Sequence, residues 1–141
     1  MMKIPSDVRE LLTSGHTIWV ATTGPDGMPN VSIKASGTLL DEDHLYFADM
    51  YSRKTRANLE RDPHVAVGVF DEERGVTVQL KGTAELIEDG SLFDGVTARL
   101  ADLAMTLPPL KYVVKITVES VWDMAAGPHA GEAIGLARTP D

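Results

Sequence analysis

Three cations lie within four residues in the segment YSRKTRANL, at Arg53, Lys54 and Arg56. The chain as a whole is acidic, with 21 Asp and Glu against 13 Lys and Arg and a formal net charge of −8. The segment also opens an expected helix over residues 52–61. Because the free N–H groups at a helix start carry partial positive charge, basic side chains are disfavoured there. The position of these three cations at a helix start therefore requires an explanation.

Two interpretations of this segment are open. In the first, Ser52 caps the helix and the cations are solvated surface charges, each costing about a few tenths of a kcal/mol. In the second, an anion occupies the helix start. The hydroxyls of Ser52 and Thr55, the free N–H groups and the side chains of Arg53 and Lys54 would then converge on a phosphate. A phosphate dianion would turn the repulsion into neutralisation.

Other residue types that could do chemistry form weaker patterns. The chain has no cysteine, which excludes disulfides, thiol chemistry and cysteine-ligated metals. Its four histidines are scattered, and His129 with Glu132 lies in a segment not expected to be helical. The segment LLDEDH lacks the length and the terminal glutamate of a calcium loop, so a charged turn is expected. No metal site is predicted, and the catalytic residues remain unassigned.

The elements that would position these residues follow from the hydrophobic pattern. Apolar and polar residues alternate over 76–86, which predicts a long strand that bends at Gly82. Asp26-Gly27 predicts a hairpin turn. Ser6, Ser52 and Ser91 are expected N-caps, the last paired with Asp94. In all, strands are expected at 16–23, 31–39, 44–50, 64–70, 76–86 and 114–123, and helices at 6–12, at 52–61 and after Ser91.

Length and composition bound the architecture. The 141 residues suit one domain over 1–141, with an irregular tail at 126–141. Strands interrupted by helices without a βαβ rhythm indicate a mainly β fold with α insertions, as a small antiparallel barrel. The acidic balance argues against nucleic-acid binding. No apolar run is long enough to span a membrane and no signal peptide is evident, so a cytoplasmic protein is expected.

Apolar residues fall on both sides of one expected strand. Val65, Val67 and Val69 alternate with Ala66, and Phe70 follows on that second side. A chain of this size with two-sided apolar strands is expected to bury one side against a partner.

Four segments, taken in order, resemble a known family: DGMPNVSI, LYFADMYSRKTRANLERDPHVAV, VQLKGTAELI and VKITVESVWDM. They are similar to the pyridoxamine 5′-phosphate oxidase-like family of FMN-binding split β-barrels, over roughly residues 5–124. The small FMN-binding members are the nearest comparison. The resemblance implies a six-stranded antiparallel split barrel and a homodimer with FMN in a groove between the subunits.

The resemblance also implies which residues touch the cofactor. Ser52, Arg53, Lys54 and Thr55 would hold the flavin phosphate, which favours the second interpretation above. The strand backbone at Val31, Ser32, Ile33 and Lys34 would run along the isoalloxazine. Phe47, Ala48 and Asp49 would flank the ribityl chain or the ring, and Trp122 would pack near the cofactor across the dimer. Lys34 is also a candidate cation for stabilising the reduced ring.

The chain departs from the vitamin-forming oxidases at two places. Ser32 stands where those enzymes carry an arginine, and the tail lacks their Arg/His segment for pyridoxamine phosphate. The expected function is therefore FMN-dependent oxidoreduction of an unidentified small substrate or redox partner. The alternatives are a non-catalytic carrier of flavin or electrons, and a barrel that holds haem or a deazaflavin instead of FMN.

Overall fold

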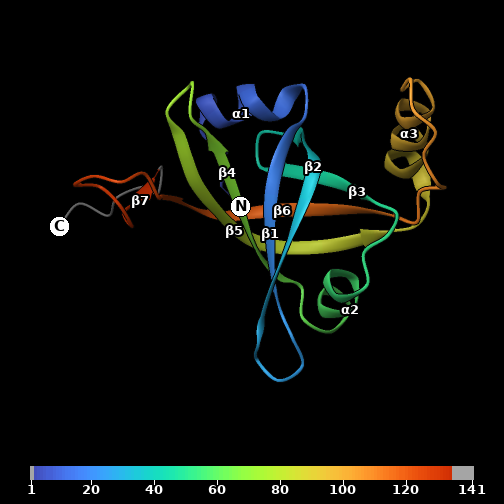
Figure 1. The fold of residues 1–141 in the computed structure, drawn as a ribbon, viewed down its shortest axis with the longest axis horizontal. Helices are drawn as coiled ribbons and strands as arrows, with labels where there is room; N and C mark the ends of the chain where they lie inside the picture. Colours follow the sequence, from blue (N-terminus) through green and yellow to red (C-terminus); the bar gives the residue numbers. More distant parts are fainter. Residues whose placement is uncertain (1, 135–141) are drawn as a thin grey trace.

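Six antiparallel strands close into a barrel, because the outer strands β3 and β6 of the sheet also pair with each other. The computed structural model describes residues 2–134 (Figure 1). The strand order is β3-β2-β1-β4-β5-β6, with β7 added beside β6. The mainly β split barrel with helical insertions is confirmed. The strands are β1 (His16–Thr23), β2 (Pro29–Asp41), β3 (His44–Asp49), β4 (His64–Asp71), β5 (Val76–Ile87), β6 (Tyr112–Asp123) and β7 (Ala133–Ile134).

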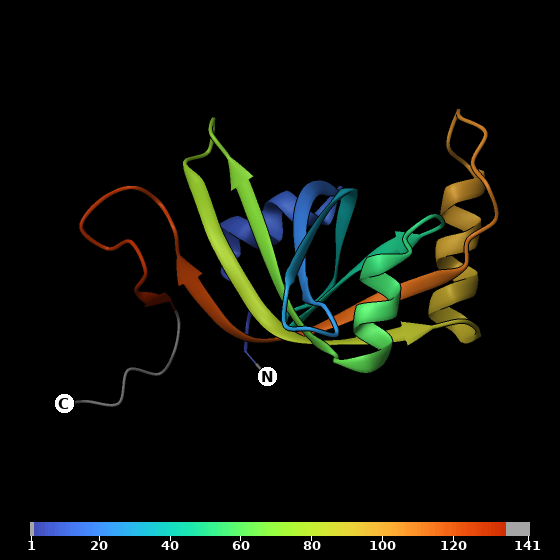
Figure 2. The same cartoon turned by 60° about the horizontal axis from the view of Figure 1, so that its bottom comes forward.

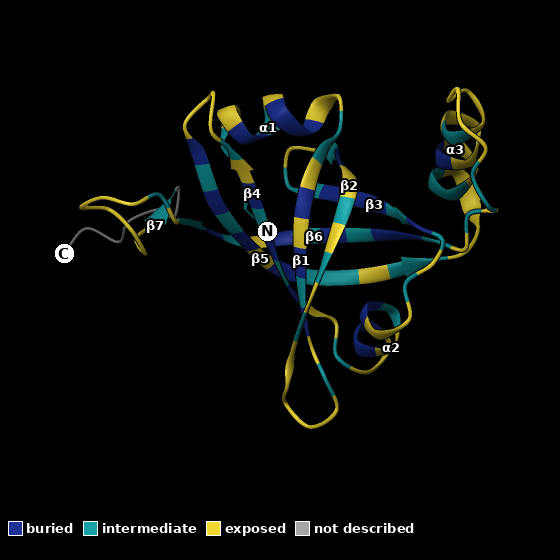
Figure 3. Ribbon diagram, in the orientation of Figure 1, coloured by how far each residue is buried: buried dark blue, intermediate teal, exposed yellow. Residues whose placement is uncertain are grey.

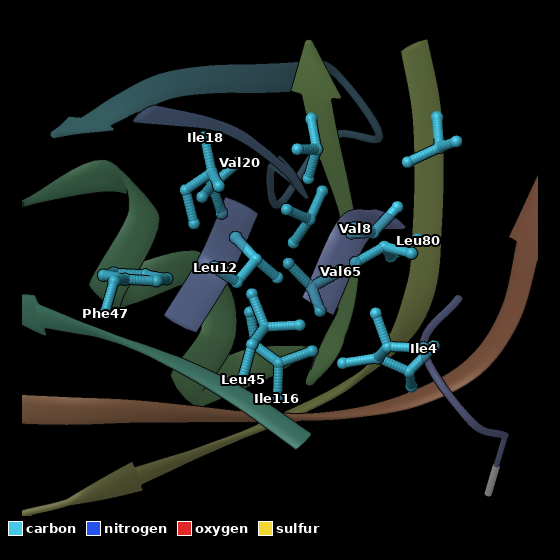
Figure 4. Packing of buried hydrophobic residues seen from close by; sticks show 14 of the residues in the cluster. Ile4, Val8, Leu12, Ile18, Val20, Leu45, Phe47, Val65, Leu80 and Ile116 are labelled. Carbon is cyan, nitrogen blue, oxygen red and sulfur yellow. The ribbon is translucent and has the colours of Figure 1, made fainter. Parts of the chain in front are cut away.

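Period-two alternation fills the barrel interior with aliphatic side chains. Ile18 and Val20 of β1, Leu45 of β3 and Ile116 of β6 are all buried and point toward one another (Figure 4). The helix α1 (Ser6–Thr13) closes one end of the barrel with its apolar side, since Val8, Leu11 and Leu12 belong to the same cluster. The barrel is therefore a packed core rather than a ligand cavity.

The other helices lie apart from this core. The helix α2 (Lys54–Arg61) follows β3 and lies beside the turn between β1 and β2 (Figures 1 and 2). The helix α3 (Gly90–Ala101) stands at one end of the molecule on a second apolar cluster that includes Tyr46, Val96 and Val113. None of the helices in the described part of the chain has the length and apolar character required to cross a bilayer.

The three predicted serine caps are wrong. Pro5, Arg53 and Asp89 occupy the N-cap positions, and none of them caps its helix through a side chain. The second helix therefore begins at Lys54 rather than at Ser52. At this helix, the Ser52 amide and the Ser52 hydroxyl both donate to the carboxylate of Asp49, which holds Ser52 in the loop before the helix.

The bend predicted at Gly82 is confirmed. The pairing of β5 with β6 shifts by one residue between Lys81 and Gly82, which is a β-bulge. A Cβ atom at Gly82 would lie 1.8 Å from the carbonyl oxygen of Thr117, so only glycine permits this close approach. The bulge allows β5 to pair with β4 along its first part and to continue beside β6 alone beyond Thr83.

The turn and the tail give a mixed result. The chain turns at the predicted place, but Pro25 and Asp26 are the central residues, since the Gly27 amide donates to the Gly24 carbonyl at 3.0 Å. Gly27 has φ 82°, and the Gly24 amide donates to the Met28 carbonyl at 2.8 Å. The tail predicted as irregular contains the short strand β7, which pairs with Val121 and Trp122. The remainder of that tail, residues 135–141, lies outside the described residues.

Candidate functional site

The strand β2 presents two different faces at the predicted flavin site. Asn30, Ser32 and Lys34 are half-buried and turn toward α2 and β3, as their contacts below show. Val31 and Ile33 lie between them and are more than half exposed on the opposite side of the strand. Alternation along a strand produces this division directly. The four predicted β2 residues therefore do not act as one surface.

A hydroxyl and amide network joins β2 to the first turn of α2. Thr55 is buried, and its Oγ1 lies 2.9 Å from Ser32 Oγ and 3.3 Å from Asn30 Nδ2, which donates to it. These contacts hold the start of α2 against Ser32 and Asn30, which precede Thr55 by 23 and 25 positions. In this arrangement the Thr55 hydroxyl is engaged with protein groups. Asn30 is a member of the site that the sequence analysis did not name.

Asp49 organises the loop between β3 and α2. Its side chain is only 3% exposed, and its carboxylate accepts hydrogen bonds from the Ser52 amide at 2.9 Å and from the Ser52 hydroxyl. The ammonium of Lys34 lies 3.9 Å from the same carboxylate and 5.3 Å from the centre of the Phe47 ring. Lys34 is therefore a partly buried, paired cation and not a solvated strand lysine. Phe47 itself belongs to the barrel core.

The two cations predicted to hold a phosphate remain available. Arg53 and Lys54 are exposed, and within residues 2–134 no carboxylate oxygen lies within 4.0 Å of either side chain. Arg56, by contrast, lies 3.8 Å from Glu60 and 5.6 Å from the Tyr112 ring centre. Since α2 begins at Lys54, both free cations border the helix end that carries partial positive charge. Such a cluster is suited to an anion.

Ala48 and Trp122 occupy different surroundings. Ala48 packs with the second apolar cluster, next to Phe47 and Asp49 in β3. Trp122 lies on β6, five residues beyond the last β6 residue that pairs with β3, Thr117. Its indole Nε1 donates to Ser120 Oγ at 2.9 Å, and Lys81 Nζ lies 5.3 Å from its ring centre. Within one chain, the fold does not bring Trp122 to the other predicted site residues.

Asn58 is a second site residue that the sequence analysis missed. It lies one helical turn after Lys54 and is buried, and its Nδ2 donates to Thr22 Oγ1 at 3.0 Å. Its Oδ1 accepts a bond from Arg61 at 3.3 Å. The spacing of four residues from Lys54 is the signal that could have placed it on the same helix face. Asn30 could likewise have been found from its period-two spacing to Ser32 and Lys34.

A second cluster of chemically active groups lies in the turn between β2 and β3. His44 Nδ1 lies 2.6 Å from an oxygen of Asp41 and 2.8 Å from an oxygen of Asp43. Burial by itself would raise the pKa of Asp41, but hydrogen bonds from His44 and Asp43 hold it below its ordinary value. His44 Nδ1 therefore lies within hydrogen-bonding distance of both carboxylates. His129 and Glu132 also contact each other, at 3.0 Å, on an exposed turn.

Apolar side chains gather on the outside of the barrel. We call Trp19, Val31, Ile33 and Phe70 the outer apolar face; each is about half or more exposed. Figure 3 shows exposed segments along β1 and β2 in yellow. The strand register places Ile33, Trp19, Gly68, Gln79 and Trp122 in one row across β2, β1, β4, β5 and β6. A shallow hollow of about 270 Å³ lies over this row. Continuous exposed apolar surface of this kind is typical of an interface.

Comparison with known proteins assigns this architecture. Residues 4–125 match the family described as pyridoxamine 5′-phosphate oxidase. The chain belongs to this family. A relative from Methanocaldococcus jannaschii, described as an uncharacterized protein, is 32% identical over 123 residues, which are 83% of this chain and 78% of the relative. Membership of the pyridoxamine 5′-phosphate oxidase family confirms the resemblance seen in the sequence.

Solved structures share the family fold. The HupZ protein of Group A Streptococcus has a TM-score of 0.75 and 27% identity, with 91% of this chain and 99% of that chain covered. A candidate pyridoxamine 5′-phosphate oxidase of Lactobacillus delbrueckii has a TM-score of 0.70 and 28% identity, covering 85% and 93%. An FMN-binding protein of Syntrophomonas wolfei has a TM-score of 0.68 but 18% identity, covering 86% of each chain. An F420 reductase has a TM-score of 0.65 at 23% identity, covering 84% and 98%. The last two likenesses show the fold alone.

Proposed function

We propose that this protein binds FMN and acts as an oxidoreductase on a small substrate or redox partner. The observation that carries the proposal is the pair Arg53 and Lys54 beside the start of α2; both are exposed, and neither has a carboxylate partner among residues 2–134. A phosphate dianion there would meet two cations and the unpaired N–H groups of the first helical turn. This neutralisation accounts for a basic cluster in an acidic chain.

The residues around this pair fit a flavin phosphate and ring in different ways. Arg53 and Lys54 would hold the phosphate, while Ser32, Thr55 and Asn30 form the polar wall between β2 and α2. Lys34, held beside Asp49, would place a positive charge near the ring and favour its reduced, anionic state. When bound, FMN supplies hydride or electron transfer. The protein supplies binding, orientation and electrostatics.

We also propose that two copies pair through the outer apolar face. Val31 and Ile33 belong to this face, while Ser32 and Lys34 of the same strand belong to the flavin site. The two surfaces therefore meet at β2, and a partner on the outer apolar face would border the cofactor. Trp122 lies in the same outward row, four strands from Ile33, so a partner's copy of this residue is the one that could complete the site.

Membership of the family is consistent with a flavin and does not select one cofactor. The fold also occurs in a protein described as FMN-binding and in an F420 reductase. A deazaflavin is therefore the second candidate, because its phosphate would meet the same two cations. Oxidation of pyridoxamine phosphate is not proposed, since Ser32 replaces the arginine expected in the vitamin-forming enzymes.

A fluorescence titration of the purified protein with FMN, F420 and riboflavin tests the proposal. We expect FMN to bind, and riboflavin, which lacks the phosphate, to bind at least about tenfold more weakly. Lys54→Glu should abolish the difference between FMN and riboflavin. Lys3→Glu is the matched control, because Lys3 is an exposed lysine paired with Glu42, between β2 and β3, and neither residue belongs to the proposed site. Equal affinity of the unaltered protein for riboflavin and FMN would contradict a phosphate site at Arg53 and Lys54.

Turnover is a separate question from binding. Steady-state oxidation of NAD(P)H by the FMN-loaded protein should proceed for many cycles if it is an oxidoreductase. A single reduction without further turnover would instead indicate a carrier of flavin or electrons.

A further inference from the structure

A hollow of about 340 Å³ opens on the outer side of the barrel, over the neighbouring strands β1, β4 and β5 and the edge of β6. Ala21, Ala66 and Gly82 leave much of its lining without large side chains. Ala21 follows the exposed Trp19 by two residues on β1, so this lining faces outward. The volume is within the range of pockets that hold small organic ligands, roughly 300–1,000 Å³. None of the residues proposed to hold FMN lines this hollow.

Glu119 reaches the hollow through the bulge in the pairing of β5 with β6. The two residues that flank Glu119 pair with Lys81 and Gly82, which are consecutive in β5. Glu119 is therefore the extra residue of the bulge and has no partner on β5. Bulges redirect side chains and are common next to functional sites. Gly82, which permits the bulge, lines the same hollow, so one backbone feature both opens this wall and brings a carboxylate to it.

The hollow is bordered by two opposite charges that do not meet, and we call it the charged hollow. Lys81 and Glu119 are exposed and lie on neighbouring strands. In the part of the chain that the structure describes, no carboxylate oxygen lies within 4.0 Å of Lys81, and no Lys, Arg or His nitrogen lies within 4.0 Å of Glu119. Lys81 Nζ instead lies 5.3 Å from the centre of the Trp122 ring, and Glu119 accepts a hydrogen bond from Thr83 Oγ1 at 3.4 Å. Each charge is therefore available to a ligand.

His64 adds a neutral hydrogen-bond acceptor to the wall of the charged hollow. Its Nδ1 lies 2.6 Å from Asp62 Oδ1. Hydrogen bonds from the His64 backbone amide and ring hold the pKa of Asp62 below its ordinary value, so this carboxylate is ionised and can only accept. Nδ1 therefore carries a proton, and the neutral ring keeps Nε2 as an acceptor. An ammonium group on a ligand would find both an anion and a neutral acceptor in this hollow.

We propose that the charged hollow binds a free α-amino acid with an aliphatic side chain. The ligand carboxylate would pair with Lys81 and its ammonium with Glu119, so one molecule would neutralise both wall charges. A ligand with a single charge would take water from the other wall charge without replacing it. The aliphatic side chain would lie against Ala21 and Ala66. This inference goes beyond the proposed function and does not depend on FMN binding.

Calorimetric titration of the full-length protein with three related molecules tests this inference. Leucine carries both charges, 4-methylpentanoate lacks the ammonium, and 3-methylbutylamine lacks the carboxylate. We expect leucine to bind at least about tenfold more tightly than either analogue. Lys81→Gln should remove the advantage of leucine over 3-methylbutylamine, and Glu119→Gln should remove its advantage over 4-methylpentanoate. Lys111→Gln and Glu85→Gln are the matched controls, since both residues are exposed and neither lines the hollow.

The possible results either support the amino-acid site or overturn it. If leucine gives no heat of binding at millimolar concentration, or binds no better than its two analogues, the site is wrong. If Lys81→Gln and Glu119→Gln keep the full affinity for leucine, or if the two controls lose as much affinity as they do, the ligand lies elsewhere and the assignment is overturned. Circular dichroism of each variant distinguishes lost binding from lost folding. A flavin titration is a separate measurement, so failure of this inference and failure of the proposed function are distinguishable.

Discussion

At the scale of single residues, the pair formed by Lys34 and Asp49 is the feature with the clearest consequence for redox chemistry. Both side chains are largely withdrawn from solvent, at 16% and 3% exposure. Charges act more strongly on a neighbouring group in such surroundings than on an open surface. The cation of Lys34 would stabilise a reduced flavin anion, whereas the carboxylate of Asp49 partly offsets this effect. The two residues therefore have opposite expected effects on the reduction potential.

Lys34→Met should lower the reduction potential of bound FMN, because it removes a cation that favours the reduced ring. Asp49→Asn should raise the potential, because it removes the carboxylate that offsets that cation. Each change is expected to be on the order of tens of millivolts. Lys34→Arg keeps the charge, so its reduction potential should stay close to that of the unaltered protein. Spectroelectrochemical titration of the FMN-loaded variants measures the effect, and equal potentials in Lys34→Met and the unaltered protein would place Lys34 outside the flavin's surroundings.

At the scale of elements, the long strand β5 shows how one glycine makes the barrel possible. Residues 76–83 of β5 pair with β4, whereas the residues beyond Thr83 pair only with β6. The strand must therefore bend near Thr83. The bulge at Gly82 provides this turn by bringing the strand backbone against Thr117. Because β6 also pairs with β3, an error at this bulge would disturb the closure of the barrel. β3 in turn carries Asp49 of the proposed site.

Gly82→Ala should destabilise the fold by at least about 2 kcal/mol, because its Cβ would overlap a backbone oxygen that cannot move freely. Gly95→Ala is the control, since Gly95 lies inside α3 and a Cβ there would meet no atom within 4 Å. That change should stabilise the protein by roughly 0.5–1 kcal/mol through helix propensity. Urea unfolding of the three proteins measures both effects. A Gly82→Ala protein as stable as the original would mean that the bulge relaxes at little cost.

At the scale of the whole molecule, the outer apolar face decides whether the proposed site is complete. Trp19, Ile33 and Phe70 lie on three adjacent strands and leave a continuous apolar area in water. Burying such an area would stabilise a pair of chains by roughly 25 cal/mol per Å² of apolar surface, before the cost of association. Since β2 lies in both this face and the proposed flavin site, association and cofactor binding are expected to be coupled.

Ile33→Lys should shift the protein from dimer to monomer, because it places a charge in the middle of the outer apolar face. Leu103→Glu is the control, since Leu103 is similarly exposed but lies after α3, outside this face. Light scattering at micromolar concentration should report a dimer for the unaltered protein and for the control. FMN affinity measured on the Ile33→Lys monomer should fall as well. A monomeric unaltered protein would contradict the shared groove.

The sequence determined the features that depend on neighbouring positions. Alternation gave the strands and placed Ser32 and Lys34 on one side of β2, and the glycine in the long alternating stretch marked the bulge at Gly82. The cation cluster at Arg53 and Lys54 was visible because its charge contrasts with that of the whole chain. These properties have periods of two to four residues, so they can be read without knowing the fold.

Only the tertiary structure decided which distant groups meet. The partner of Lys34 is Asp49, that of Thr55 is Ser32, and that of β3 is β6; none of these pairings leaves a local pattern. The Ser52 cap failed as a prediction for the same reason, because the Ser52 amide and hydroxyl both donate to the buried carboxylate of Asp49, which holds Ser52 in the loop before α2. Hydrogen bonds and ion pairs depend on what the closed barrel brings within about 3–4 Å. Local periodicity specifies the strands and their faces, whereas the proposed site exists only because barrel closure brings β2, β3 and α2 together.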